Sequence, residues 1–148
     1  MKKKIIALLS GLTVMTSAVC FATVPDSGIA LADVAPGSSV EAAKAKLGTP
    51  NYGGDKLYFP NGIVIEVEDY NPGIVEEIST TTGAVATPGG VQVGMAESVI
   101  TSVYGAPDKL DRDSDDTEYT YYSSSYGKKM EFKVVSGTIV KIKCETRH

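Results

Sequence analysis

Residues 94–107 have the sequence GMAESVITSVYGAP, and residues 37–50 have the sequence GSSVEAAKAKLGTP. Each stretch begins with a glycine and ends with a second glycine and a proline, at a constant offset of 57 residues. Between the glycines, apolar residues recur at helical spacing, most clearly Met95, Val99 and Val103. Ser38 followed by Glu41 forms a capping box, and glycine followed by proline stops a helix. The sequence therefore predicts helices at residues 39–47 and 96–104, in two copies of one unit.

Three predicted strands follow each helix. Met130, Phe132 and Val134 alternate with charged residues, as in a sheet with one buried face. The predicted strands are residues 56–59, 62–68, 74–80, 118–122, 128–135 and 138–145, with turns at 60–62 and 71–73. The alignment of the last strand of each copy stays open by one residue. We expect an α+β fold in which two tandem helix-plus-antiparallel-meander (αβββ) repeats form one sheet with helices packed on one face.

The N-terminus has the pattern of a secretory signal peptide. Lys2, Lys3 and Lys4 precede the apolar residues 5–24, and the small residues Ala30 and Ala32 suit cleavage after Ala32. Two alternatives are an uncleaved membrane anchor, since the apolar run has about the length of a bilayer span, and lipid attachment at Cys20, for which the preceding residues are unsuitable. The predicted organisation is a signal peptide (1–32), a first repeat (33–80), a linker (81–90) and a second repeat (91–148).

Composition excludes several classes of function. The 148 residues carry 14 Lys and Arg against 18 Asp and Glu, and the sole histidine is His148. A Ser-His-Asp triad, a Cys-His pair and a zinc site therefore lack parts. After cleavage at Ala32, 11 basic and 17 acidic groups give a net charge of −6, which disfavours duplex nucleic acid as a partner. Cys144 is then a single cysteine without a disulfide partner. We expect no catalytic residue, cofactor or metal.

Short motifs in the second copy resemble those of two related groups. The segment Val91-Gln92-Val93-Gly94-Met95, followed by Tyr104-Gly105-Ala106-Pro107 and an aromatic-rich strand pair, resembles the helix-then-meander unit of the β-lactamase inhibitory proteins. It also resembles the small lipoprotein subunit of the bacterial outer-membrane β-barrel assembly machinery. The resemblance implies a protein-binding module, and it transfers no individual functional residue.

Candidate binding residues lie in the second copy. Exposed tyrosines are enriched at interfaces, and they also stack on sugar rings, so a cell-wall glycan is an alternative ligand to a protein. An acidic segment beside them has the alternating spacing that opens a calcium loop, but it lacks the loop's glycine and bidentate glutamate. A solvated acidic loop is therefore favoured over weak calcium binding. The candidate partner-binding residues are Tyr119, Tyr121, Tyr122, Tyr126, Asp111, Asp113 and Asp115.

These observations favour an exported, non-enzymatic protein-binding module of the cell envelope or extracellular space, without a stable membrane span after signal cleavage. Its alternatives are an inhibitor of an extracellular or periplasmic hydrolase and an envelope assembly or scaffold protein. Inhibition predicts that the acidic loop enters an active site, whereas a scaffold predicts a sheet contact that does not depend on that loop. The partner and the oligomeric state do not follow from the sequence.

Overall fold

The computed structural model describes residues 23–148. Most of the expected signal peptide, including Cys20, lies outside the described residues. No helix in the described part is long and apolar enough to cross a membrane. The elements, in chain order, are η1 (Asp26–Gly28), α1 (Val40–Leu47), β1 (Asn51–Gly53), β2 (Lys56–Tyr58), β3 (Ile63–Glu68), β4 (Asn71–Thr80), α2 (Ser98–Tyr104), β5 (Lys109–Arg112), β6 (Thr117–Tyr122), β7 (Lys128–Val135) and β8 (Thr138–Thr146).

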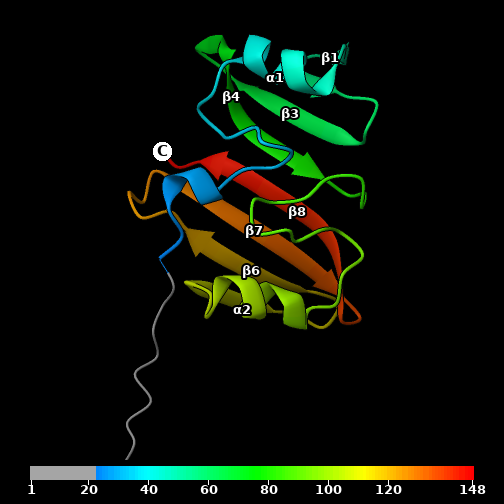
Figure 1. Ribbon diagram of the computed structural model, residues 1–148, viewed down its shortest axis with the longest axis vertical. Coiled ribbons are helices and arrows are strands. Elements are labelled where there is room, and N and C mark those ends of the chain that lie inside the picture. Colours follow the sequence, from blue (N-terminus) through cyan, green and yellow to red (C-terminus); the bar gives the residue numbers. More distant parts are fainter. Residues whose placement is uncertain (1–22) are drawn as a thin grey trace, which may run out of the picture.

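The strands within residues 23–148 form one antiparallel sheet. Its eight strands have the order β1-β2-β3-β4-β8-β7-β6-β5 (Figure 1). The two halves of the chain meet where β4 pairs with β8, and Ile78 lies opposite Cys144 there. The last strands of the two halves therefore lie side by side at the centre of the sheet.

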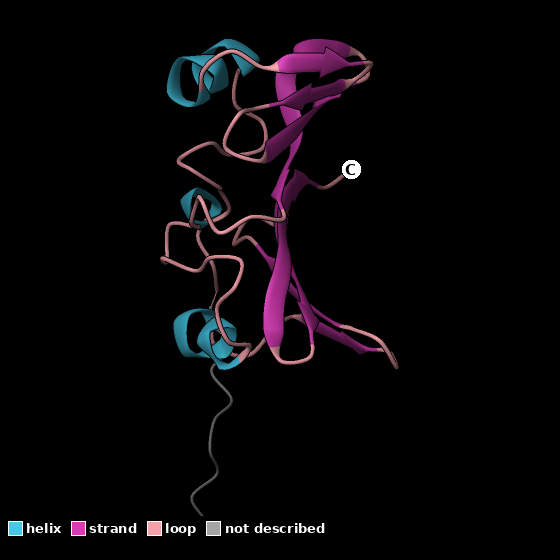
Figure 2. Cartoon of the chain, turned by 90° about the vertical axis from the view of Figure 1, so that its right-hand side faces the viewer, coloured by secondary structure: helices cyan, strands magenta, loops and turns pink. Residues whose placement is uncertain are grey.

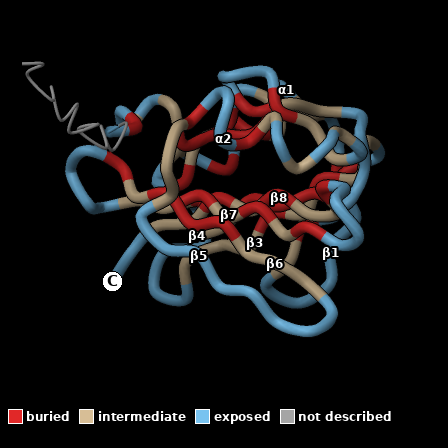
Figure 3. Tube along the Cα trace, turned by 90° about the horizontal axis from the view of Figure 1, so that it is seen from below, coloured by how far each residue is buried: buried red, intermediate tan, exposed pale blue. Residues whose placement is uncertain are grey.

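The helices lie on one face of the sheet (Figure 2). Buried residues gather between them and the sheet (Figure 3), where one apolar cluster includes Ile65, Ile100 and Phe132 from both halves. The α+β class is therefore as expected. Each helix is followed by four strands and not by the three predicted, because β1 and β5 form the two edges of the sheet.

The ends of the helices differ in detail from the prediction. The side chain that caps α1 is Ser39, whose hydroxyl accepts a hydrogen bond from the amide of Ala42 at 3.1 Å, whereas Ser38 bonds the carbonyl of Ala35. Gly48 and Gly105 end the two helices with φ angles of 95° and 74°. Positive φ angles strain residues with a Cβ atom, which explains glycine at both stops.

Two predicted connections also differ. Residues 71–73 belong to β4, because the hairpin turn is formed by Asp69 and Tyr70. The predicted linker, residues 81–90, has no regular secondary structure but packs onto the domain: the Tyr104 hydroxyl donates to Thr87 Oγ1 at 2.6 Å, and both residues are buried.

Residues 24–34 pack as part of the folded domain. Val24 forms a parallel bridge with Ser123, and Leu31 forms an antiparallel bridge with Val34. Ile29 and Leu31 have no solvent exposure. Val24, Ile29 and Leu31, which the prediction assigned to the end of the signal peptide, thus lie within the apolar core.

Candidate partner-binding face

The sheet face opposite the helices is strongly charged. Strand alternation points the odd-numbered apolar residues of β3 and the even-numbered ones of β7 into the core, and it turns their charged neighbours outward. Strand pairing then aligns one continuous row across six strands, which we call the charged row. Its members are Lys56, Glu66, Glu77, Glu145, Lys129 and Tyr122.

Two lysines connect the centre of this face. Lys143 Nζ lies 2.7 Å from Glu131 Oε2 and 3.0 Å from Glu145 Oε2. Lys129 Nζ lies 2.7 Å and 2.6 Å from carboxylate oxygens of the same two glutamates. Each lysine therefore bridges two carboxylates, and each carboxylate accepts from two lysines. Such a network orders four long side chains together.

The carboxylates of the face differ in their electrostatic environment. Partial burial acts to raise the pKa of Glu131, but hydrogen bonds from Lys129 and Lys143 outweigh it and hold that pKa below its ordinary value. For Glu77, burial and the neighbouring carboxylates Glu66 and Glu145 raise the pKa. Its nearest cation is Lys143, at 3.9 Å. Glu77 on β4 is therefore a carboxylate of the row that the neighbouring lysines neutralise incompletely.

A hollow of about 350 Å³ opens beside the middle of the charged row, next to the C-terminal residues Thr146 to His148. Four glutamates, Lys129, Arg147 and a histidine give it a mixed polar lining. The lining residues are Glu66, Glu76, Glu77, Lys129, Glu145, Thr146, Arg147 and His148. This hollow is polar, so it suits a charged or hydrogen-bonding side chain better than an apolar ligand.

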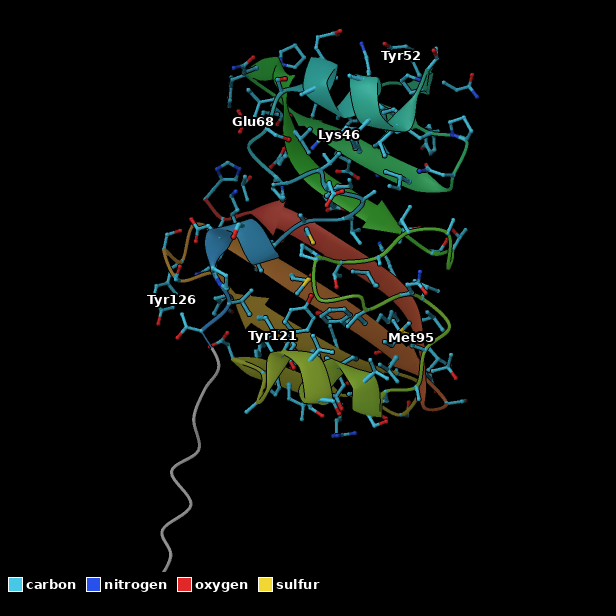
Figure 4. All side chains as sticks on the ribbon, viewed as in Figure 1. Lys46, Tyr52, Glu68, Met95, Tyr121 and Tyr126 are labelled. Carbon is cyan, nitrogen blue, oxygen red and sulfur yellow. The ribbon has the colours of Figure 1, made fainter. Side chains whose placement is uncertain are left out.

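An aromatic cluster borders the hollow. The Arg147 guanidinium lies over the ring of Tyr122, 4.1 Å from its centroid, and it donates to the carbonyl of Tyr126 at 3.0 Å. The Tyr122 and Tyr126 rings are 6.4 Å apart. Tyr126 is 67% exposed, and Figure 4 shows it at the margin of the molecule. The cluster therefore presents an aromatic ring beside a cation, both open to a partner.

The predicted tyrosines divide between two environments. Tyr122 and Tyr126 belong to the cluster just described. Tyr119 and Tyr121 are buried in the core, where Tyr119 donates to Glu97 and Tyr121 donates to the carbonyl of Gly105 at 2.9 Å. Figure 4 shows Tyr121 between the sheet and α2. The prediction that these two contact a partner is corrected by their burial, since both face α2.

The predicted aspartates lie along an exposed hairpin. Asp111 pairs with Lys109 at 2.7 Å, and Asp113 and Asp115 are exposed. The Asp113 amide donates to the carbonyl of Asp116 at 2.9 Å, which closes the turn. Within residues 23–148, no three acidic, histidine or cysteine side chains are placed to hold a metal ion.

Three residues of this face were absent from the predicted site. Glu77 and Lys143 come together only through the pairing of β4 with β8, and Arg147 reaches Tyr122 only through the fold of the C-terminus. The alternation of charge in the last strand was visible in the sequence, but its cross-strand neighbours were not. Their discovery required the register between the two halves.

No family model and no curated protein matches the chain. One solved structure with a similar fold is a DUF4309 family protein (YjgB) from Bacillus subtilis subsp. subtilis str. 168, with 16% identity, a TM-score of 0.49, and coverage of 74% of this chain and 79% of that chain. Another is an extracellular protein containing a SCP domain from Bacillus anthracis str. Ames, with 10% identity, a TM-score of 0.47, and coverage of 75% of this chain and 44% of that chain. Likeness at this level carries no functional inference.

Proposed function

We propose that this chain is an exported, non-enzymatic protein-binding module that holds a protein partner at the Tyr122–Tyr126–Arg147 end of its outer sheet face. The observation that carries the proposal is the exposed tyrosine and arginine beside a polar hollow. Tyrosine and arginine are the residue types that most often dominate binding energy at protein interfaces.

The polar hollow and the exposed tyrosine beside it favour a protein partner over a glycan. A polar hollow next to an exposed ring matches a polypeptide that offers a polar side chain next to an apolar one. Arg147 already covers one face of the Tyr122 ring, which leaves less of that ring for stacking on a sugar. Lys129 and Lys143 are each held by two carboxylates, an arrangement that favours positional order over proton transfer.

A matched pair of variants tests this face. The chain offers a second tyrosine with a nearby cation, because Lys44 Nζ lies 5.6 Å from the centroid of Tyr52, which is 66% exposed. Cross-linking and capture from the envelope fraction would compare the wild type with Tyr126→Ala/Arg147→Ala and with Tyr52→Ala/Lys44→Ala. A specific partner should be retained by the wild type and the Tyr52/Lys44 variant and lost by the Tyr126/Arg147 variant. Equal capture by all three would refute the proposed surface.

A second candidate function is inhibition of an extracellular hydrolase, as the resemblance to β-lactamase inhibitory proteins implies. The exposed turn at residues 113–116 favours it, because its closed backbone presents acidic side chains at a sheet edge. An Asp113→Ala/Asp115→Ala variant distinguishes the two functions. Loss of the partner in this variant alone supports inhibition through the loop, while loss only in the Tyr126/Arg147 variant supports a scaffold contact through the sheet. Retention on purified cell-wall glycan without protein would instead support the glycan alternative.

A further inference from the structure

The N-terminal segment 24–34 contributes side chains to the centre of the domain. Val24, Ile29, Leu31 and Val34 belong to the same buried cluster as Phe132. Two of them, Ile29 and Leu31, have no exposed surface. Cleavage after Ala32 would remove Ile29 and Leu31 and leave voids in a core that is otherwise close-packed.

Polar contacts attach the same segment to separate parts of the domain. The Asp26 carboxylate accepts from the Ser125 amide at 3.1 Å and from the Ser125 hydroxyl at 2.7 Å. The Ser124 amide donates to the carbonyl of Val24 at 2.8 Å, and the Ala32 amide donates to the carbonyl of Ala86 at 3.1 Å. These contacts satisfy backbone groups both in the β6–β7 loop and in the connection between the two halves.

The alanine at position 30 has a structural explanation. Ala30 is buried at 5% exposure, and Ala32 and Asp33 have φ angles of 48° and 59° in a tight turn between Leu31 and Val34. A larger side chain at Ala30 would not fit the core. Packing therefore accounts for the small residue at position 30 without a cleavage site.

We propose that the leader is removed after Ala22, so that the exported chain begins at Thr23 and keeps residues 24–34 as part of its fold. Cys20-Phe21-Ala22 supplies small residues at the first and third positions that a membrane-bound leader peptidase requires. The enzyme hydrolyses the Ala22–Thr23 peptide bond: water supplies the oxygen of the new Ala22 carboxylate, and the Thr23 nitrogen leaves as a protonated amine.

This cleavage has consequences for the mature protein. Cys20 leaves with the leader, so it cannot carry a lipid, and Cys144 is the sole cysteine of the exported chain. The mature chain has 126 residues with 11 basic and 18 acidic groups, a net charge of −7. The inference rests on the export that the proposed function includes.

Mass spectrometry of the exported protein tests the inference. The full-length gene product is expressed in a secreting bacterium, and the mature N-terminus is determined by intact mass and N-terminal sequencing. A chain that begins at Thr23 is expected. A chain that begins at Asp33 or at another residue overturns this inference while leaving export intact. An unprocessed chain confined to the cytoplasm overturns both the inference and export, and a full-length membrane-bound chain overturns cleavage.

Two variants with the same chemical change sharpen the test. Asparagine is too large and polar for the position before the cleaved bond, yet it tolerates the left-handed backbone found at Ala32. Ala22→Asn should abolish the Thr23 N-terminus and accumulate precursor. Ala32→Asn should be processed as the wild type and begin at Thr23. The reverse pattern would place the cleavage after Ala32 and overturn the inference.

Discussion

Leu31→Ala, made in a chain that begins at Thr23, should destabilise the domain strongly. Leu31 has no exposed surface, and its substitution removes three buried carbon groups. At about 0.8 kcal/mol for each buried methylene, the transfer cost is about 2.4 kcal/mol. The residual cavity brings the expected loss in the free energy of unfolding to about 3 to 4 kcal/mol. For a domain of this size, the melting temperature should fall by about 10 °C or more.

The matched control is Leu110→Ala. This leucine is 42% exposed on the edge strand β5, so the same chemical change should cost under about 1 kcal/mol. Urea unfolding followed by circular dichroism measures both variants. If Leu31→Ala lowers the free energy of unfolding no more than Leu110→Ala does, residues 24–34 do not belong to the folded core. Cleavage after Ala22 then loses its structural basis.

Three further outcomes are expected. Tyr104→Phe should lower the free energy of unfolding by about 1 to 2 kcal/mol in urea, because it removes the buried hydroxyl bond to Thr87; an unchanged midpoint would contradict the assigned bond. The pKa of Glu131 is held below its ordinary value of 4.5, so its contribution to stability is present above that pH and is lost as the pH falls through the folded-state pKa. Glu131→Gln should therefore lose less stability between about pH 7 and pH 3 than the wild type, as measured by thermal unfolding, and an equal loss would exclude this role. Burial raises the pKa of the Cys144 thiol, so a thiol-reactive dye should label it only after unfolding in urea, and rapid labelling of the native protein would show that the site is open.

Alternation predicted the strands that have one buried face. β7 was placed at residues 128–135, as observed, because its apolar residues recur with period two. β1 and β5 were missed because every residue in them is exposed, so the sequence shows no alternation there. The Asn71-Pro72-Gly73 turn was misplaced because a strong local turn signal was overridden by pairing of Asn71 with Glu68.

The residues of the candidate site were predicted only in part, because their exposure depends on which face of a strand each one occupies. Adjacent residues on a strand face opposite sides, so Tyr121 and Tyr122 had to differ in exposure, but the sequence did not show which one is buried. The pairing of Tyr121 with Met130 settles this, since Met130 faces the core. Arg147 reaches the Tyr122 ring from the end of another strand, a contact that no local pattern encodes.

The bonds between Asp26 and Ser125 close a chain loop of 99 residues. Closing a loop of that length requires most of the polypeptide to be available, and folds dominated by such distant contacts form slowly. During synthesis, Asp26 can therefore reach its place beside Ser125 only after nearly the whole chain has left the ribosome.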